Sequence, residues 1–180
     1  IAAVPGQSRL RTILKSDWLR VAAIALITLS LNAVYQHYVA DNKELAMSIV
    51  SVPAGQRTNV TLPDGTNVWL NARTTIRFPE KFSTRNRTVE LMGEGYFDVV
   101  KDEERPFIVK TDKYSIEVLG TKFDVEAYPD EEKFVTTLMQ GSVKLTSQAS
   151  PSHQVTLKPE HKATLKDGRL EVSKVTDFNP

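Results

Sequence analysis

The chain has 180 residues, 41% of them apolar, which is enough for one hydrophobic core with a short appendage. Its formal charge of +1 implies no general electrostatic attraction to nucleic acid. The absence of cysteine excludes disulfides, thiolate metal sites and cysteine nucleophiles. The first residue is Ile1 rather than Met, so we expect a fragment that lacks its true start.

The charge is unevenly distributed along the chain. Before residue 41 the net charge is +3, because one acidic residue, Asp17, stands against four basic residues: Arg9, Arg11, Lys15 and Arg20. The remaining 19 basic and 21 acidic residues give a net charge of −2. Residues 1–17 are polar and basic, and we predict that they form a cytoplasmic juxtamembrane segment.

An uncharged stretch follows, from Val21 to Ala40. Twenty helical residues span about 30 Å, which is the thickness of the hydrocarbon core of a bilayer. Trp18 lies at one end and Tyr35 and Tyr38 lie at the other, as expected for rings at the two membrane interfaces. These features predict a transmembrane helix over 18–40, and the basic flank before it predicts that the chain beyond the helix is exported.

Two alternatives stay open for this stretch. It contains Asn32, Gln36 and His37, so a soluble core helix is one of them. A cleaved signal peptide is the other, although His37, Tyr38 and Val39 are bulky for a cleavage site. Only Asn32 lies deep in the predicted span, and it is a candidate weak point at which the helix opens for regulated cleavage. A hydrogen bond to a neighbouring helix is the alternative role for Asn32.

After a predicted linker over 41–47, the apolar period changes to two, which is typical of half-buried strands. Turns rich in Pro, Gly, Asn and Asp separate the runs. The predicted strands are 48–52, 57–62, 67–72, 74–78, 88–92, 96–100, 106–110, 115–119, 122–127, 134–139, 142–146, 154–158, 162–166 and 170–174. The pattern predicts an all-β domain over 48–180, either a twisted multi-stranded solenoid or a sandwich.

Three glycines stand where strands are expected to end or bend. They are Gly93 and Gly95 before the aromatic Tyr96, and Gly120 before Thr121. A residue without Cβ can take positive φ or let another backbone pass closely. We therefore predict bulges or tight corners at these positions.

The sequence gives little support for a metal site or for a catalytic serine nucleophile. The three histidines, His37, His153 and His161, have no carboxylate at metal-ligand spacing. No G-x-S-x-G motif marks a serine nucleophile. We predict no metal, no cofactor and no catalytic residue.

Carboxylates and aromatic residues allow other functions. Glycosidase chemistry needs two carboxyl groups across a cleft, and the residues that could supply them are Glu94, Asp98, Asp124 and Glu126. Asp98 and Asp124 alternate with apolar neighbours, so they are predicted to face solvent. A sugar platform would need Trp69, Tyr96, Tyr114 and Tyr128, whose strand positions favour a place in the core or at its rim. The acidic run 102–104 is predicted to be a solvated turn, with a regulatory contact as the alternative.

An ordered set of motifs between Val52 and Leu165 resembles the FecR family of anti-sigma regulators. The motifs are VTLPDGTNVWLNARTTIRFPEKF, RTVEL, GEGYFDVVKDEERPFIV, VLGTKFDVEAY and TLMQGSVKL. The order of the set is more specific than any single motif. The resemblance implies structural roles for these residues: Asp64, Gly65, Leu70, Gly93, Glu94, Phe97, Val99, Pro106, Phe107, Gly120, Thr121, Phe123, Val125 and Gly141.

The resemblance also implies a function and partners. FecR-like proteins are single-pass inner-membrane regulators whose cytoplasmic N-terminal segment holds an extracytoplasmic-function sigma factor. Their periplasmic part senses the signalling domain of a TonB-dependent outer-membrane receptor that takes up iron chelates or glycans. The resemblance therefore implies a regulator of a sigma factor rather than an enzyme, with its N-terminus cytoplasmic, its β domain periplasmic and no direct contact with nucleic acid.

This chain departs from the family pattern in two places. Pro159-Glu160 stands where the family usually has Pro-Gly. The chain also stops at Pro180, before a small αβ module that many members carry, and we expect the sigma-binding segment to be missing or reduced to 1–17. The alternative function is a membrane-tethered periplasmic glycan-binding or envelope scaffold domain, and an envelope hydrolase is a third.

Overall fold

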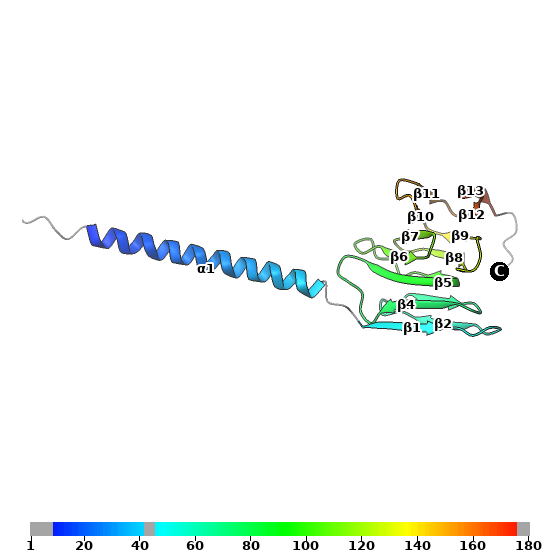
Figure 1. Ribbon diagram of the computed structural model, residues 1–180, viewed down its shortest axis with the longest axis horizontal. Helices are drawn as coiled ribbons and strands as arrows, with labels where there is room; N and C mark the ends of the chain where they lie inside the picture. The colour runs from blue at the N-terminus through cyan, green and yellow to red at the C-terminus, as the bar shows by residue number, and fades with distance from the viewer. Residues whose placement is uncertain (1–8, 42–45, 176–180) are drawn as a thin grey trace, which may run out of the picture. The chain divides into compact units, whose positions relative to one another are not determined.

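The structure is a computed structural model that describes residues 9–41 and 46–175. The chain divides into two compact units, Ile1–Glu44 and Leu45–Pro180. Among the described residues, the first unit contains one helix and the second contains thirteen strands (Figure 1). The predicted order of one helix followed by an all-β domain is confirmed.

Helix α1 extends over Arg9–Asp41 and so begins inside the segment that was predicted to be juxtamembrane. Exposed apolar side chains lie around its whole circumference. They are Val21, Ile24, Leu26, Ile27, Leu29, Leu31 and Val34. In the part of the helix whose side chains are described, no segment is long and apolar enough to cross a membrane, so the span predicted over 18–40 is not confirmed.

Four residues of the linker predicted over 41–47, residues 42–45, lie outside the described part of the chain. The strands that follow are β1 (Met47–Ser51), β2 (Thr58–Thr61), β3 (Asn67–Leu70), β4 (Thr75–Pro79), β5 (Arg87–Asp98), β6 (Phe107–Lys110), β7 (Tyr114–Val118), β8 (Lys122–Ala127), β9 (Val135–Gln140), β10 (Val143–Ser147), β11 (Gln154–Leu157), β12 (His161–Lys166) and β13 (Arg169–Lys174). The prediction of two separate strands at 88–92 and 96–100 is wrong, because β5 is a single strand that contains the first and extends into the second as far as Asp98.

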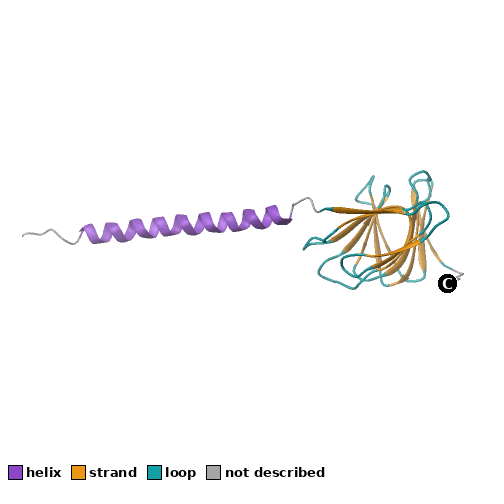
Figure 2. Cartoon of the chain, turned by 90° about the horizontal axis from the view of Figure 1, so that it is seen from below, coloured by secondary structure: helices purple, strands orange, loops and turns teal. Residues whose placement is uncertain are grey.

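The strands form one continuous sheet that folds into two layers and shares β5 between them (Figures 1 and 2). Layer A has the order β1-β4-β5-β6-β7-β10-β11. Layer B has the order β2-β3-β5-β8-β9-β12-β13. Neighbouring strands are antiparallel except for the parallel pair β5 and β6. The predicted all-β class is confirmed, and the sheet curves into a nearly closed, barrel-like form (Figure 2).

Strand β5 passes from layer A to layer B at Gly93. Residues 87–92 pair with β6 and β4 of layer A, whereas residues from Gly93 onward pair with β8 of layer B. Gly93 has a φ of 120°, and a Cβ there would lie 2.7 Å from Cα of Thr74. Only glycine combines this backbone conformation with so close an approach. The predicted bend at Gly93 is confirmed, but the strand does not end there.

One hydrophobic core lies between the two layers. Successive residues of β5 and β8 alternate between this core and the outer face, because side chains of a strand point to opposite sides of the sheet. Phe97 on β5 stacks on Phe123 on β8, with ring centroids 5.1 Å apart, and lies 6.2 Å from Phe107 in layer A. Tyr114 of layer A meets Phe134, which leads into β9 of layer B, at 4.7 Å. These contacts join the two layers through aromatic rings.

Candidate functional site

The outer face of layer B carries a groove. Because Val68, Phe97 and Phe123 point into the core, their neighbours on β3, β5 and β8 point outward. Strand register then places Trp69 opposite Tyr96, and Tyr96 opposite Asp124. Three strands that are distant in sequence thus contribute one row of side chains.

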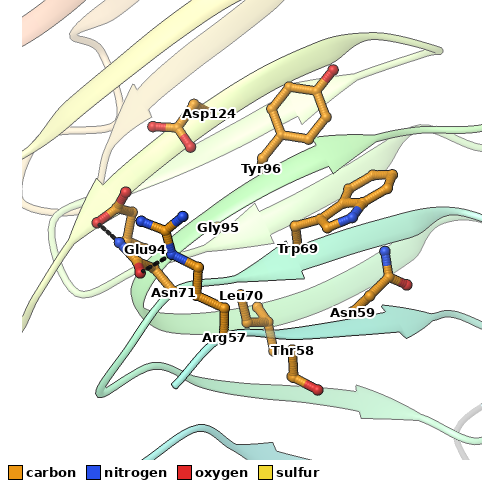
Figure 3. A pocket seen from close by; sticks show the side chains of 10 residues that line it. All are labelled: Arg57, Thr58, Asn59, Trp69, Leu70, Asn71, Glu94, Gly95, Tyr96 and Asp124. Carbon is orange, nitrogen blue, oxygen red and sulfur yellow. Dashed lines mark hydrogen bonds between the residues drawn. The ribbon is translucent and has the colours of Figure 1, made fainter. Parts of the chain in front are cut away.

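The groove has a volume of about 420 Å³ and extends from β2 across β3 and β5 to β8 (Figure 3). Its residues are Arg57, Thr58, Asn59, Trp69, Leu70, Asn71, Glu94, Gly95, Tyr96 and Asp124. One end is aromatic and the other end is polar, and the groove is open to solvent.

The aromatic end consists of Trp69 and Tyr96. Trp69 is 45% exposed, and its ring centroid lies 5.5 Å from that of Tyr96 at an interplanar angle of 59°. Tyr114, which the sequence grouped with these residues, is instead buried in the core. An exposed tryptophan beside a second, tilted ring provides an apolar surface that a ligand can cover.

The polar end is organised by Asn71. Its amide nitrogen donates to Oε2 of Glu94 at 2.8 Å, and its Oδ1 accepts from Nε of Arg57 at 3.1 Å (Figure 3). The hydroxyl of Tyr128 donates to the carbonyl of Ala72 at 3.0 Å and lies 3.4 Å from Oε2 of Glu94. These bonds fix the Glu94 carboxylate at the edge of the groove.

Asp124 is a groove carboxylate without a paired cation in the described structure. Burial raises its pKa to about 7, and the negative charges of Glu94 and Glu126 add to this shift. Among the described residues, no hydrogen bond or salt bridge reaches its carboxylate. Glu126, in contrast, is paired with Lys133 at 2.7 Å.

The four carboxylates considered for glycosidase chemistry all lie on this outer face, as their alternation with core residues requires. Asp98 is bound by Lys122 at 2.9 Å, and Glu126 is bound by Lys133, so each of these carboxylates has a cation of its own. Glu94 and Asp124 are the two that line the groove. This arrangement suits the recognition of a ligand by charge and by an aromatic surface.

A second polar cluster is buried and joins a turn to β5. Nη1 of Arg87 lies 2.8 Å from Oδ2 of Asp64, and the two side chains are only 1% and 7% exposed. The guanidinium also donates to the carbonyls of Val100 and Arg105, and Asp64 accepts from the backbone and hydroxyl of Thr66. Sequence reasoning missed Arg87, although its place on the core-facing side of β5, in step with Val89, was a signal.

The residues implied by the family resemblance occupy three kinds of position. Core positions hold Leu70, Phe97, Val99, Phe107, Phe123 and Val125, with the buried Thr121. Four glycines lie in turns or where another segment of the chain passes close to the backbone: Gly65, Gly93, Gly120 and Gly141. Pro106 lies directly before β6. The two acidic residues of the set lie at different sites: Asp64 forms the buried ion pair, and Glu94 lines the groove.

Metal ligands do not gather in the described part of the chain, which excludes the side chain of His37. No group of three His, Cys, Asp or Glu residues there is close enough to hold an ion. His153 is exposed, and Nδ1 of His161 lies 2.9 Å from the carbonyl of Pro159.

Comparisons with known proteins agree on one family. Residues 48–144 match the family described as FecR protein. Two similar crystal structures, at 2.50 Å and 1.65 Å resolution, are of a proposed anti-sigma factor from Parabacteroides distasonis ATCC 8503. The first is 35% identical with a TM-score of 0.68, covering 72% of this chain and 60% of that chain. The second is 36% identical with a TM-score of 0.67, covering 71% and 59%.

This chain therefore spans about 60% of the length of these solved relatives. No curated protein matches it. The family match extends over more than half of the residues, and the similar structures share the architecture of the β domain. The chain belongs to the FecR protein family.

Proposed function

We propose that this chain is the anchor and extracytoplasmic β domain of a transmembrane regulator of an extracytoplasmic-function sigma factor. The observation that carries the proposal is the FecR match over residues 48–144. The similarity to solved structures of a proposed anti-sigma factor supports it. The role is regulatory and not enzymatic, and the open groove on layer B supports binding rather than chemistry.

The proposed location is the inner membrane, with a single pass over 18–40, residues 1–17 in the cytoplasm and residues 48–180 in the periplasm. The apolar side chains around α1 and the charge of +3 before residue 41 support this orientation. The sigma factor then binds on the cytoplasmic side. The signalling domain of a TonB-dependent receptor binds on the periplasmic side.

Asn32 is exposed on α1 and is proposed as the point where the anchor opens for regulated cleavage. A polar side chain within an apolar span offers the backbone an alternative hydrogen-bond partner. We expect Asn32→Leu to slow the release of the N-terminal fragment several-fold in an immunoblot time course after induction. Release at the wild-type rate would contradict this role, and Leu31→Ile, an exchange of one apolar side chain for another at the preceding position, is the control.

Capture of the full-length protein from membranes tests the proposed function. We expect it to resist extraction with alkaline carbonate and, after solubilisation in detergent, to bring down a sigma factor and a TonB-dependent receptor identified by mass spectrometry. The same capture from cells that lack the receptor is the control, and the sigma factor should then remain. Capture of neither protein would overturn the proposal. Capture of peptidoglycan or polysaccharide instead would favour the glycan-binding alternative.

A further inference from the structure

The groove on layer B combines three features that determine what it can bind. Its aromatic floor consists of Trp69, which is 45% exposed, and the half-buried Tyr96 beside it. Its polar end presents two carboxylates, Glu94 and Asp124, on neighbouring strands. Arg57, a cation that lines the same groove, donates to Asn71, and among the described residues it forms no salt bridge with either carboxylate.

The carboxylates in the groove differ from the others on this face because, in the part of the chain that the structure describes, they have no paired cation. Other carboxylates of layer B's outer face have their own cations, with Lys122 on Asp98 and Lys133 on Glu126. Glu94 and Asp124 are left with a negative charge that no lysine or arginine neutralises by direct contact in the described structure. A positively charged ligand complements this end of the groove.

The spacing of the two carboxylates selects the shape of the cation. Asp124 is directly opposite Tyr96, and Glu94 precedes Tyr96 by two residues, so the two carboxylates are diagonal neighbours about 7 Å apart at Cβ. A planar guanidinium with donors on both edges can bridge two acceptors at this distance, which a compact ammonium cannot do as well. Its aliphatic stem would lie across Tyr96 and Trp69, since arginine side chains stack well on aromatic rings.

We propose that this groove binds an arginine side chain presented by a basic segment of a partner protein. The guanidinium lies between Glu94 and Asp124, and the stem covers the exposed faces of Tyr96 and Trp69. The inference does not depend on control of a sigma factor, because any partner on the same side of the membrane with an accessible arginine meets the requirement.

The chain offers a direct optical probe of this binding. It contains two tryptophans, Trp18 and Trp69, so the substitution Trp18→Phe leaves the groove tryptophan as the sole indole fluorophore. The experiment uses the full chain in a polyoxyethylene detergent, because a maltoside detergent would compete if the groove bound sugars. The probe is the peptide acetyl-Gly-Ser-Arg-Ser-Gly-amide, which contains no aromatic residue, and matched peptides carry lysine or citrulline in place of arginine.

We expect the arginine peptide to change Trp69 emission with saturation, the lysine peptide to bind several-fold more weakly and the citrulline peptide to give no saturable change. Asp124→Asn and Glu94→Gln should each weaken binding of the arginine peptide about tenfold. The matched control is Glu117→Gln, which alters a carboxylate of layer A that is paired with Lys144. It should leave binding unchanged.

Three outcomes would overturn the proposal. One is equal binding of the citrulline and arginine peptides, because charge would then not matter. Another is an unchanged affinity in Asp124→Asn with native circular dichroism. The third is saturable binding of chitohexaose or cellohexaose without binding of the arginine peptide, which would make the groove a glycan site. None of these outcomes depends on whether a sigma factor is captured.

Discussion

Replacing Asp64 by alanine is expected to lower the free energy of unfolding of the β domain by about 3–5 kcal/mol. The substitution leaves the Arg87 guanidinium, which is 1% exposed, without the carboxylate that lies 2.8 Å from it. A buried cation without a partner is far more costly than the loss of a surface ion pair. Urea denaturation followed by Trp69 fluorescence and far-ultraviolet circular dichroism measures the change.

The location of this pair explains why its loss affects more than one contact. Arg87 begins β5 and bonds the carbonyls of Val100 and Arg105 as well as Asp64. It therefore ties the turn around Asp64 to the segment that connects β5 with β6. Nη2 of Arg87 is buried without a hydrogen-bond partner in the described structure, while the guanidinium lies 5.5 Å from the ring centroid of Phe107. The charge thus depends mainly on one carboxylate.

Two further variants test the cause of this loss. Glu103→Ala removes a carboxylate from an ion pair with Lys101 in which both side chains are largely exposed, and it should leave stability unchanged within the error of the measurement. The double variant Asp64→Leu/Arg87→Met removes both buried charges and should recover most of the stability that Asp64→Ala loses. A loss below about 1 kcal/mol in Asp64→Ala would show that water already reaches the guanidinium.

The sequence predicts the alternation of the strands but not their neighbours. Period two predicted correctly that Asp98 and Asp124 face outward, because that property depends only on the local chain. The row from Trp69 through Tyr96 to Asp124 depends on β5 pairing with both β3 and β8, which lie far from it in sequence. The groove therefore becomes visible only when the strand order is known.

Contacts between residues distant in sequence also explain why two strands were predicted where β5 is a single strand. Glycines at 93 and 95 indicate that something unusual happens there, and an end or a bend agrees equally well with the sequence. The choice is made by Thr74, which packs against Gly93 and bonds both the nitrogen and the carbonyl of Glu94 through its hydroxyl. That contact is formed by residues about twenty positions apart, so no local pattern reports it. Likewise, the core-facing position of Arg87 predicts that a buried acidic partner exists, but the sequence does not identify that partner as Asp64.

Asp124→Asn is expected to stabilise the protein at pH 8 by about 2 kcal/mol and to have little effect at pH 4. In the folded protein, burial and the charges of Glu94 and Glu126 raise the pKa of Asp124 from 3.8 to about 7. The folded state then binds more protons than the unfolded state between these values, so stability falls as the pH rises through that range and levels off above it. The pKa shift corresponds to a destabilisation of about 4 kcal/mol if solvent does not screen the carboxylate. Partial exposure of the side chain reduces the expected destabilisation by about half.

The charged groups around Asp124 define the control. Glu94 faces it from β5 and Glu126 lies on β8 with Lys133 attached, while the outward residues of β9 next to it, Val135 and Thr137, carry no charge. Asp98→Asn changes a carboxylate on the same face that Lys122 neutralises, and it should give a difference below about 1 kcal/mol that does not grow between pH 5 and pH 8. Equal pH profiles for Asp124→Asn and Asp98→Asn would contradict the assignment.

A carboxylate that lowers the stability of the free protein at neutral pH is typical of a binding site rather than of a structural position. A bound guanidinium would favour the ionised form of Asp124, so the arginine peptide should release a proton near pH 7 and restore stability in proportion to its affinity. Thermal unfolding with and without the peptide at pH 5.5 and pH 8 measures both effects. The stabilisation should be larger at pH 8, and at the same peptide concentration it should be smaller in Asp124→Asn, with no dependence on pH over this range. A larger stabilisation at pH 5.5 would mean that the neutral form of Asp124 contacts the ligand.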